Sequence, residues 1–90
     1  MLKADGFDDA VLGFGSRCGE EDLLVYDYDK CVDILVANIK EDMEEAEYDE
    51  EEAYIEAYEH MEFNVCGSYM GKGTPLFLRP ATLEEIEECL

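Results

Sequence analysis

An acidic stretch from Glu41 to Glu62 constrains how this chain can fold. Twelve of its 22 residues are Asp or Glu, none is Lys or Arg, and no fixed positive charge lies between Lys40 and Lys72. On a continuous α-helix the stretch would carry roughly one negative charge per 2.8 Å of length. One strand of duplex DNA carries about one charge per 3.4 Å, and both strands together about one per 1.7 Å. The stretch therefore has the charge density of a nucleic acid, carried by a protein.

The size and composition of the chain indicate one small folded domain, residues 1–90. Hydrophobic residues make up 48% of the chain, which is enough to build a core despite the acid content. The formal net charge is −19, so DNA, RNA and anionic membranes should be repelled, and a basic protein is the expected partner. Because salt screens self-repulsion, we also expect stability to rise with ionic strength.

The sequence indicates a cytosolic protein with reduced thiols. Residues 1–6 lack the apolar run of a signal peptide, and no segment approaches the roughly 20 apolar residues of a membrane span. The cysteines form no C-x-x-C pair, so we expect no zinc site and treat them as small hydrophobes. They are Cys18, Cys31, Cys66 and Cys89.

Short apolar runs predict three strands, at about residues 10–15, 23–26 and 76–78. A polar, glycine-containing connection separates the first two runs and suits an antiparallel hairpin. Asp27 stands where a helix N-cap belongs, and apolar residues then recur at three-to-four spacing. That pattern predicts a first helix over about 28–42.

Two further helices are expected. Asp49 and Glu52 have the spacing of a capping box, and the apolar periodicity that follows predicts one helix over about 50–70. A second box, formed by Thr82 and Glu85, predicts a helix over about 82–89. Its apolar stripe is narrow and consists of Leu83, Ile86 and Leu90.

These elements predict an α+β fold in the order strand–strand–helix–helix–strand–helix. We expect a small, mostly antiparallel three-stranded sheet with the two long helices on one face.

Several segments partly match known catalytic or ligand-binding motifs, but each departs from the motif at an essential position. The glycines of 13–19 are spaced one residue too far for a dinucleotide fingerprint, and 67–73 lacks the spacing and following helix of a phosphate loop. Residues 27–33 place Cys and Val where a calcium loop needs a ligand and a glycine. His60 and Cys66 are six residues apart, off the spacing of one helical turn. We expect no catalytic residues, metal or cofactor, and no enzyme.

The acidic stretch is the candidate partner-binding surface, and a merely solvated face is the alternative. Tyr48, Tyr54 or Tyr58, where exposed, would supply aromatic anchors. Carboxylates from position 45 to position 59 recur every three or four residues and would form a ridge on continuous helix. The expected partner-binding residues are Glu41, Asp42, Glu44, Glu45, Glu47, Asp49, Glu52, Glu56, Glu59 and Glu62.

The segment 62–77 reads E-F-N-V-C-G-S-Y-M-G-K-G-T-P-L-F. It resembles a recurring segment, E-F-N-x-x-G-x-Y-x-G-x-x-T-P-x-F, of small uncharacterised phage and prophage proteins. Residues 26–31 resemble the entry of those proteins into their first helix. That family has no assigned activity, so the resemblance implies no catalytic or binding residue.

By analogy with acidic phage proteins, the resemblance implies an inhibitor of the anti-CRISPR or anti-restriction type, acting in the host cytoplasm. It would mimic DNA and occupy a basic nucleic-acid-binding surface of a host defence protein. The alternative is a non-enzymatic phage structural or assembly module that forms a homodimer through the stripe of residues 83–90. A small enzyme using Cys66 or His60 is the third hypothesis.

Overall fold

The computed structural model describes residues 1–44, 47–67 and 71–90. The order of strands and α-helices agrees with the prediction, and the structure adds a 3-10 turn, η1, and a π-helical turn, η2. The elements are η1 (Asp8–Ala10), β1 (Val11–Gly15), β2 (Leu23–Asp27), α1 (Tyr28–Asp42), α2 (Glu50–His60), η2 (Met61–Val65), β3 (Leu76–Leu78) and α3 (Leu83–Cys89).

The three strands form one mixed sheet in the order β1-β2-β3. β1 and β2 pair antiparallel, with a bulge between Val11 and Gly13, whereas β2 and β3 pair parallel. The expectation of a mostly antiparallel sheet is thus only half right. The chain leaves the end of β2 through α1, returns through α2 and enters β3 in the direction of β2, which makes a crossover connection and a parallel pair.

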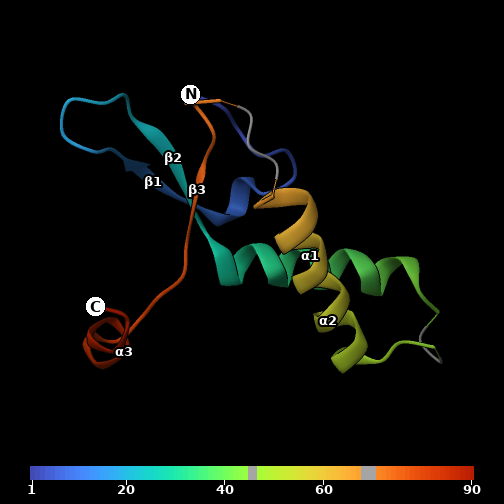
Figure 1. The fold of residues 1–90 in the computed structure, drawn as a ribbon. Helices are drawn as coiled ribbons and strands as arrows, with labels where there is room; N and C mark the ends of the chain where they lie inside the picture. The colour runs from blue at the N-terminus through green and yellow to red at the C-terminus, as the bar shows by residue number, and fades with distance from the viewer. Residues whose placement is uncertain (45–46, 68–70) are drawn as a thin grey trace.

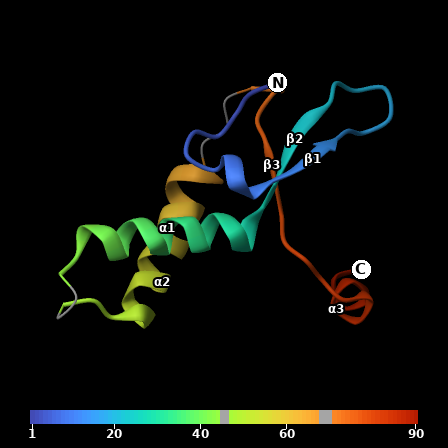
Figure 2. The ribbon, with the colours of Figure 1, turned by 180° about the vertical axis from the view of Figure 1, so that it is seen from behind.

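The two long helices extend the sheet rather than lying flat on one of its faces. In Figures 1 and 2, α1 runs on from the end of β2, and the β1–β2 and α1–α2 turns lie at opposite ends of the molecule. The radius of gyration is 15.2 Å, against about 12 Å for a compact domain of this length. The principal extents of 52 × 32 × 20 Å describe the same elongated shape.

The core lies where the sheet meets the helices. Tyr26 is fully buried there; its hydroxyl oxygen accepts a 2.9 Å hydrogen bond from the Ala4 N–H, and its ring stacks on Phe77 at 5.5 Å. Alanines on α2 let it approach α1 closely. The buried set is Phe7, Ala10, Tyr26, Tyr28, Cys31, Val32, Val36, Ala53, Ala57 and Met61.

The helix predicted over 50–70 is α-helical only as far as His60. It continues as the π-helical turn η2, in which the Cys66 N–H donates a 2.6 Å hydrogen bond to the Met61 carbonyl oxygen. Gly67 follows where a Cβ atom would lie 2.9 Å from the carbonyl oxygen of Phe63, so a side chain would force a shift. The last predicted positions, 68–70, lie outside the described residues.

α3 stands apart from the sheet and from both long helices (Figures 1 and 2). As predicted, Thr82 caps it, with the hydroxyl oxygen accepting from the Glu85 N–H at 3.2 Å. None of its residues is buried, and Leu83 and Leu90 are 72% and 96% exposed.

Candidate partner-binding surface

The acidic stretch folds into a turn between two helices, so it is not one continuous helix. α1 ends at Asp42 and α2 begins at Glu50, and the connection lies at the end of the molecule remote from the sheet (Figure 1). We call the exposed carboxylates of this turn the acidic tip. Its described members are Glu41, Asp42, Glu44, Glu47, Asp49, Glu50, Glu51 and Glu52.

Backbone hydrogen bonds shape the acidic tip. The Glu44 carbonyl oxygen accepts from the N–H groups of Glu47 and Tyr48, at 2.9 and 3.1 Å. The Asp49 carboxylate then accepts from the Glu51 N–H at 3.0 Å, which confirms the predicted helix start at this residue. These hydrogen bonds position the described carboxylates on either side of the helix start.

The helix dipoles act in opposite directions on the two sides of the tip. Glu50 and Glu51 lie in the first turn of α2, where negative charge is favoured, whereas Glu41 and Asp42 lie in the last turn of α1, where it is disfavoured. Lys40 offsets part of that cost, and its ammonium lies 5.6 Å from the centre of the Tyr48 ring. This contact ties the connection to α1.

The remaining predicted residues leave the tip along α2. Glu56 and Glu59 are both exposed on α2. Glu62 lies farther along and accepts a 2.6 Å hydrogen bond from the Tyr28 hydroxyl, so its carboxylate is engaged within the fold. Glu45 lies outside the described residues.

The break at the connection also shortens the expected ridge. Asp49 is the N-cap of α2 and not part of the helix, so only Glu52, Glu56 and Glu59 follow one another at helical spacing. The structure instead adds two residues that the candidate set omitted, Glu50 and Glu51, both exposed in the first turn. The capping box of Asp49 and Glu52 was the sequence signal for these two residues, because it places positions 50 and 51 in the first turn of the helix.

Of the three candidate aromatic anchors, Tyr58 is the most accessible. It is 45% exposed and stacks on Tyr28 with ring centres 6.3 Å apart. Tyr48 and Tyr54 are half-buried, and the Tyr54 hydroxyl lies at a long 3.4 Å from the Asp33 carboxylate. Tyr58 is thus the aromatic residue that a partner could best contact.

A cluster of titratable groups joins α1, η2 and the end of β3. The Arg79 guanidinium lies 5.8 Å from the centre of the Tyr28 ring. Burial, together with the hydrogen bond to Glu62, raises the pKa of Tyr28. Burial and the nearby Glu62 charge also raise the pKa of the Cys66 thiol, which keeps it protonated at neutral pH and makes it a poor nucleophile.

The cysteines differ in their surroundings. Cys31 is fully buried, and burial raises the pKa of its thiol to about 11. The other three, Cys18, Cys66 and Cys89, are exposed, so only Cys31 is packed as a small hydrophobe in the core. His60 is exposed as well, with its Nδ1 atom 3.4 Å from the side-chain nitrogen of Asn64.

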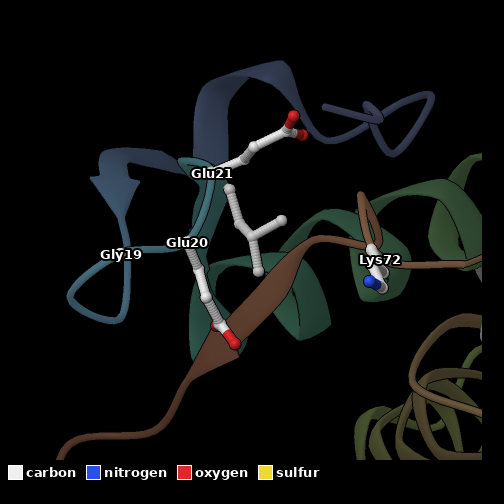
Figure 3. Close-up of a pocket in the computed structure, with 5 residues that line it drawn as sticks. Gly19, Glu20, Glu21 and Lys72 are labelled. Carbon is white, nitrogen blue, oxygen red and sulfur yellow. The ribbon is translucent and has the colours of Figure 1, made fainter.

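An open hollow near the β1–β2 turn has charged side chains in its lining. It is lined by Gly19, Glu20, Glu21, Leu23 and Lys72, so it contains both signs of charge (Figure 3). Over the described ranges, no group of three or more His, Cys, Asp or Glu side chains is placed to hold a metal ion.

Three comparisons of this chain with known proteins found no match. No family model matches it, and no significant match was found among the curated proteins or the solved structures. In the part of the chain that the structure describes, no helix combines the length and apolar character needed to cross a membrane.

Proposed function

We propose that the protein is a non-enzymatic inhibitor whose acidic tip occupies a basic, nucleic-acid-binding groove of a protein partner. The observation that carries this proposal is the gathering of the described tip carboxylates at the adjoining ends of α1 and α2 and in the connection between them, at the end of the molecule farthest from the sheet. Like charges repel, so an arrangement of this kind persists only because two helices and their caps hold it.

The mechanism is electrostatic. A one-signed surface on a protruding turn steers a cationic partner at long range, and its ordered carboxylates replace the phosphates that the partner normally contacts. The helix ends that carry most of these carboxylates are already formed, which lowers the cost of ordering them on binding. Tyr58 stacks on Tyr28 at the start of α1, so it lies at the other end of the helical hairpin and is contacted only by a partner that extends along α2 from the tip.

A host defence effector, such as a Cas nuclease or a restriction enzyme, is the target class that we propose. The resemblance of residues 62–77 to phage proteins supports this choice, because such effectors bind nucleic acid through basic channels. The protein would then work in the host cytoplasm and contact no nucleic acid itself. Carboxylates of α3, which stands apart from the tip, add only to the overall negative charge of the protein.

A displacement assay tests the proposal. A fluorescent duplex is bound to a Cas effector or a restriction enzyme, and the protein is titrated in at several salt concentrations. We expect the protein to release the duplex at low salt. In a parallel titration without duplex, the protein should bind the effector more weakly as salt rises, because screening weakens the attraction; this second titration is needed because duplex binding itself also falls with salt. Direct binding to the effector that does not depend on salt would rule out charge mimicry.

A second candidate function is a phage assembly module that forms a homodimer. The exposed apolar stripe of α3 favours it, since Leu83 and Leu90 are among the most exposed apolar residues of the chain. Light scattering would detect a dimer, and truncation at Thr82 should abolish it.

A further inference from the structure

An open cavity lies between the π-helical turn η2 and β3, where β3 passes the first turn of α1. Its volume is about 260 Å³, slightly below the range of about 300–1,000 Å³ that is typical of pockets for drug-sized ligands. An occupant would therefore have to be as small as a single amino acid. Tyr28 of α1 lines the cavity, together with Glu62 and Cys66 on the side of η2, and with residues 74–77 and Arg79 on the side of β3.

Strand pairing places a cation on one wall of the cavity. Asp27 and Leu78 are partners in the parallel pair of β2 and β3, so the residues that follow them, Tyr28 and Arg79, lie side by side. The Arg79 guanidinium carbon is 5.8 Å from the centre of the Tyr28 ring, a distance at which the ring face attracts a cation. A guanidinium carries five N–H donors in a planar fork, which suits two parallel hydrogen bonds to a carboxylate.

The other wall carries acceptors for a donor such as an ammonium group. One oxygen of the Glu62 carboxylate accepts the 2.6 Å hydrogen bond from the Tyr28 hydroxyl. A carboxylate has about four lone-pair sites, and the Tyr28 oxygen, which donates its one hydrogen to Glu62, can still accept a hydrogen bond itself. Glu62 belongs to the π-helical turn, and turns of this kind occur frequently at functional sites.

The two charges line the same cavity without neutralising each other. Over residues 1–44, 47–67 and 71–90, the one ion pair joins Lys3 to Asp8, so Arg79 and Glu62 do not form one. Tyr28 separates them, because the guanidinium lies over its ring and the carboxylate contacts its hydroxyl. The cavity therefore has a cationic wall and an anionic wall.

The two walls favour a ligand that carries both signs of charge. A simple anion would meet the Glu62 carboxylate and the field of a chain whose net charge is −19. A simple cation would meet the Arg79 guanidinium. A zwitterion has no net charge to be repelled at long range, and it can place one group on each wall. Pro75 and Phe77 add apolar surface to the lining of the cavity.

We propose that this cavity binds a free α-amino acid with an apolar side chain. The ligand carboxylate accepts from the Arg79 guanidinium, the ligand ammonium donates to Glu62 and to the Tyr28 oxygen, and the ligand side chain lies against Pro75 and Phe77. The site is at the base of the helical hairpin, whereas the acidic tip is at its far end, so this inference does not depend on the proposed function.

Titration of the isotope-labelled full chain with L-leucine, followed by amide chemical shifts in NMR spectra, tests the site. We expect saturable shifts that are largest in η2 and in residues 74–79, with a Kd on the order of 1 mM for so small a ligand. Two analogues with the same side chain separate the charges. Isocaproate lacks the ammonium group and leucinamide lacks the carboxylate, so each should bind about tenfold more weakly or worse. No saturable shift with leucine, or equal binding of either analogue, would overturn the proposal.

Two substitutions in the walls test the assigned contacts. Arg79→Gln and Glu62→Gln should each weaken leucine binding about tenfold, and the glutamine at position 62 keeps an acceptor for the Tyr28 hydroxyl. Arg17→Gln and Glu59→Gln are the matched controls, because they remove the same charges from exposed residues that do not line the cavity, and they should bind leucine as the wild type does. Equal losses in a wall variant and its control would overturn the assignment. None of these outcomes bears on duplex displacement by the tip.

Discussion

The Tyr28 hydroxyl donates a 2.6 Å hydrogen bond to the Glu62 carboxylate, which links the first turn of α1 to the π-helical turn after α2. The two residues are 34 positions apart, so the bond helps to close the base of the helical hairpin that presents the acidic tip. A carboxylate that belongs to the acidic stretch is in this way used to hold the fold together.

Removing this bond should destabilise the protein. Tyr28→Phe keeps the buried ring but loses the donor, and hydrogen bonds to charged groups contribute about 1.5–3 kcal/mol. Because Glu62 can turn to solvent, we expect the lower end of that range in urea unfolding. Tyr54→Phe is the matched control, since its contact to Asp33 is 3.4 Å long and exposed, and it should change stability by less than about 0.5 kcal/mol. Equal effects of the two substitutions would contradict this account of the bond.

The buried thiol should make stability fall at alkaline pH. The pKa of Cys31 is raised from 9.0 to about 11 in the fold, so the unfolded chain loses this proton first. The protonated Cys31 thiol therefore contributes at most about 2–3 kcal/mol to the free energy of unfolding. This contribution is fully present below about pH 9 and is lost as the pH rises towards 11. The raised pKa of Tyr28 acts in the same direction above pH 10.

Urea unfolding of wild type and Cys31→Ala at several pH values measures this contribution. The variant starts less stable because a buried side chain has been truncated, but its stability should fall less steeply between pH 9 and 11. Parallel pH profiles for the two proteins would show that Cys31 is not the group responsible.

Salt should stabilise the fold. With 25 acidic and six basic residues, the chain repels itself, and the Debye length shrinks from about 30 Å at 0.01 M to about 8 Å at 0.15 M salt. A gain of 1 kcal/mol corresponds to about 4–8 °C in Tm for a domain of this size, so we expect a rise of several degrees. A Tm that falls over this range would be the opposite of what the net charge requires.

The two sides of the acidic tip should respond differently to neutralisation. Replacing Glu41 and Asp42 by their amides removes charge from the unfavourable end of α1, whereas Glu50→Gln with Glu51→Gln removes it from the favourable end of α2. Each pair of substitutions removes two negative charges, so both relieve the repulsion within the tip to a similar extent. The first pair should therefore be more stable than the second by about 1 kcal/mol in urea unfolding. Equal stabilities would indicate that no helix boundary separates the two pairs.

The local signals in the sequence predicted the elements well where caps and short apolar runs mark them. Asp27, Asp49 and Thr82 all cap the helices assigned to them, because a side-chain oxygen at an N-cap is a local interaction that needs no tertiary context. The direction of β3 was not predictable in this way. It depends on how the helical hairpin returns the chain to the sheet, which no local pattern encodes.

The sequence identified most of the acidic residues of the candidate surface, but not the connection between two helices on which they lie. A run of carboxylates has no periodicity that distinguishes a helix from a turn. The predicted ridge therefore continues across Asp49, although this residue is the N-cap of α2 and marks the end of the connection. The π-helical turn was missed for a similar reason. The spacing of Met61 and Val65 suits an α-helix, and the 2.6 Å bond between Cys66 and Met61 that widens the turn leaves no mark in the sequence pattern.

A comparison of two variants with equal net charge tests the proposed function most directly. One carries Gln in place of Glu41, Glu44, Glu47 and Glu50 in the acidic tip, and the other carries Gln in place of Glu84, Glu85, Glu87 and Glu88 on α3. Both lose four negative charges, and both are titrated against the duplex-bound effector at low salt. If the tip is the binding surface, the tip variant should lose about tenfold or more in affinity, roughly 1.4 kcal/mol, and the α3 variant distinctly less. Equal losses would mean that only total charge matters, and would contradict a binding surface placed at the α1–α2 turn.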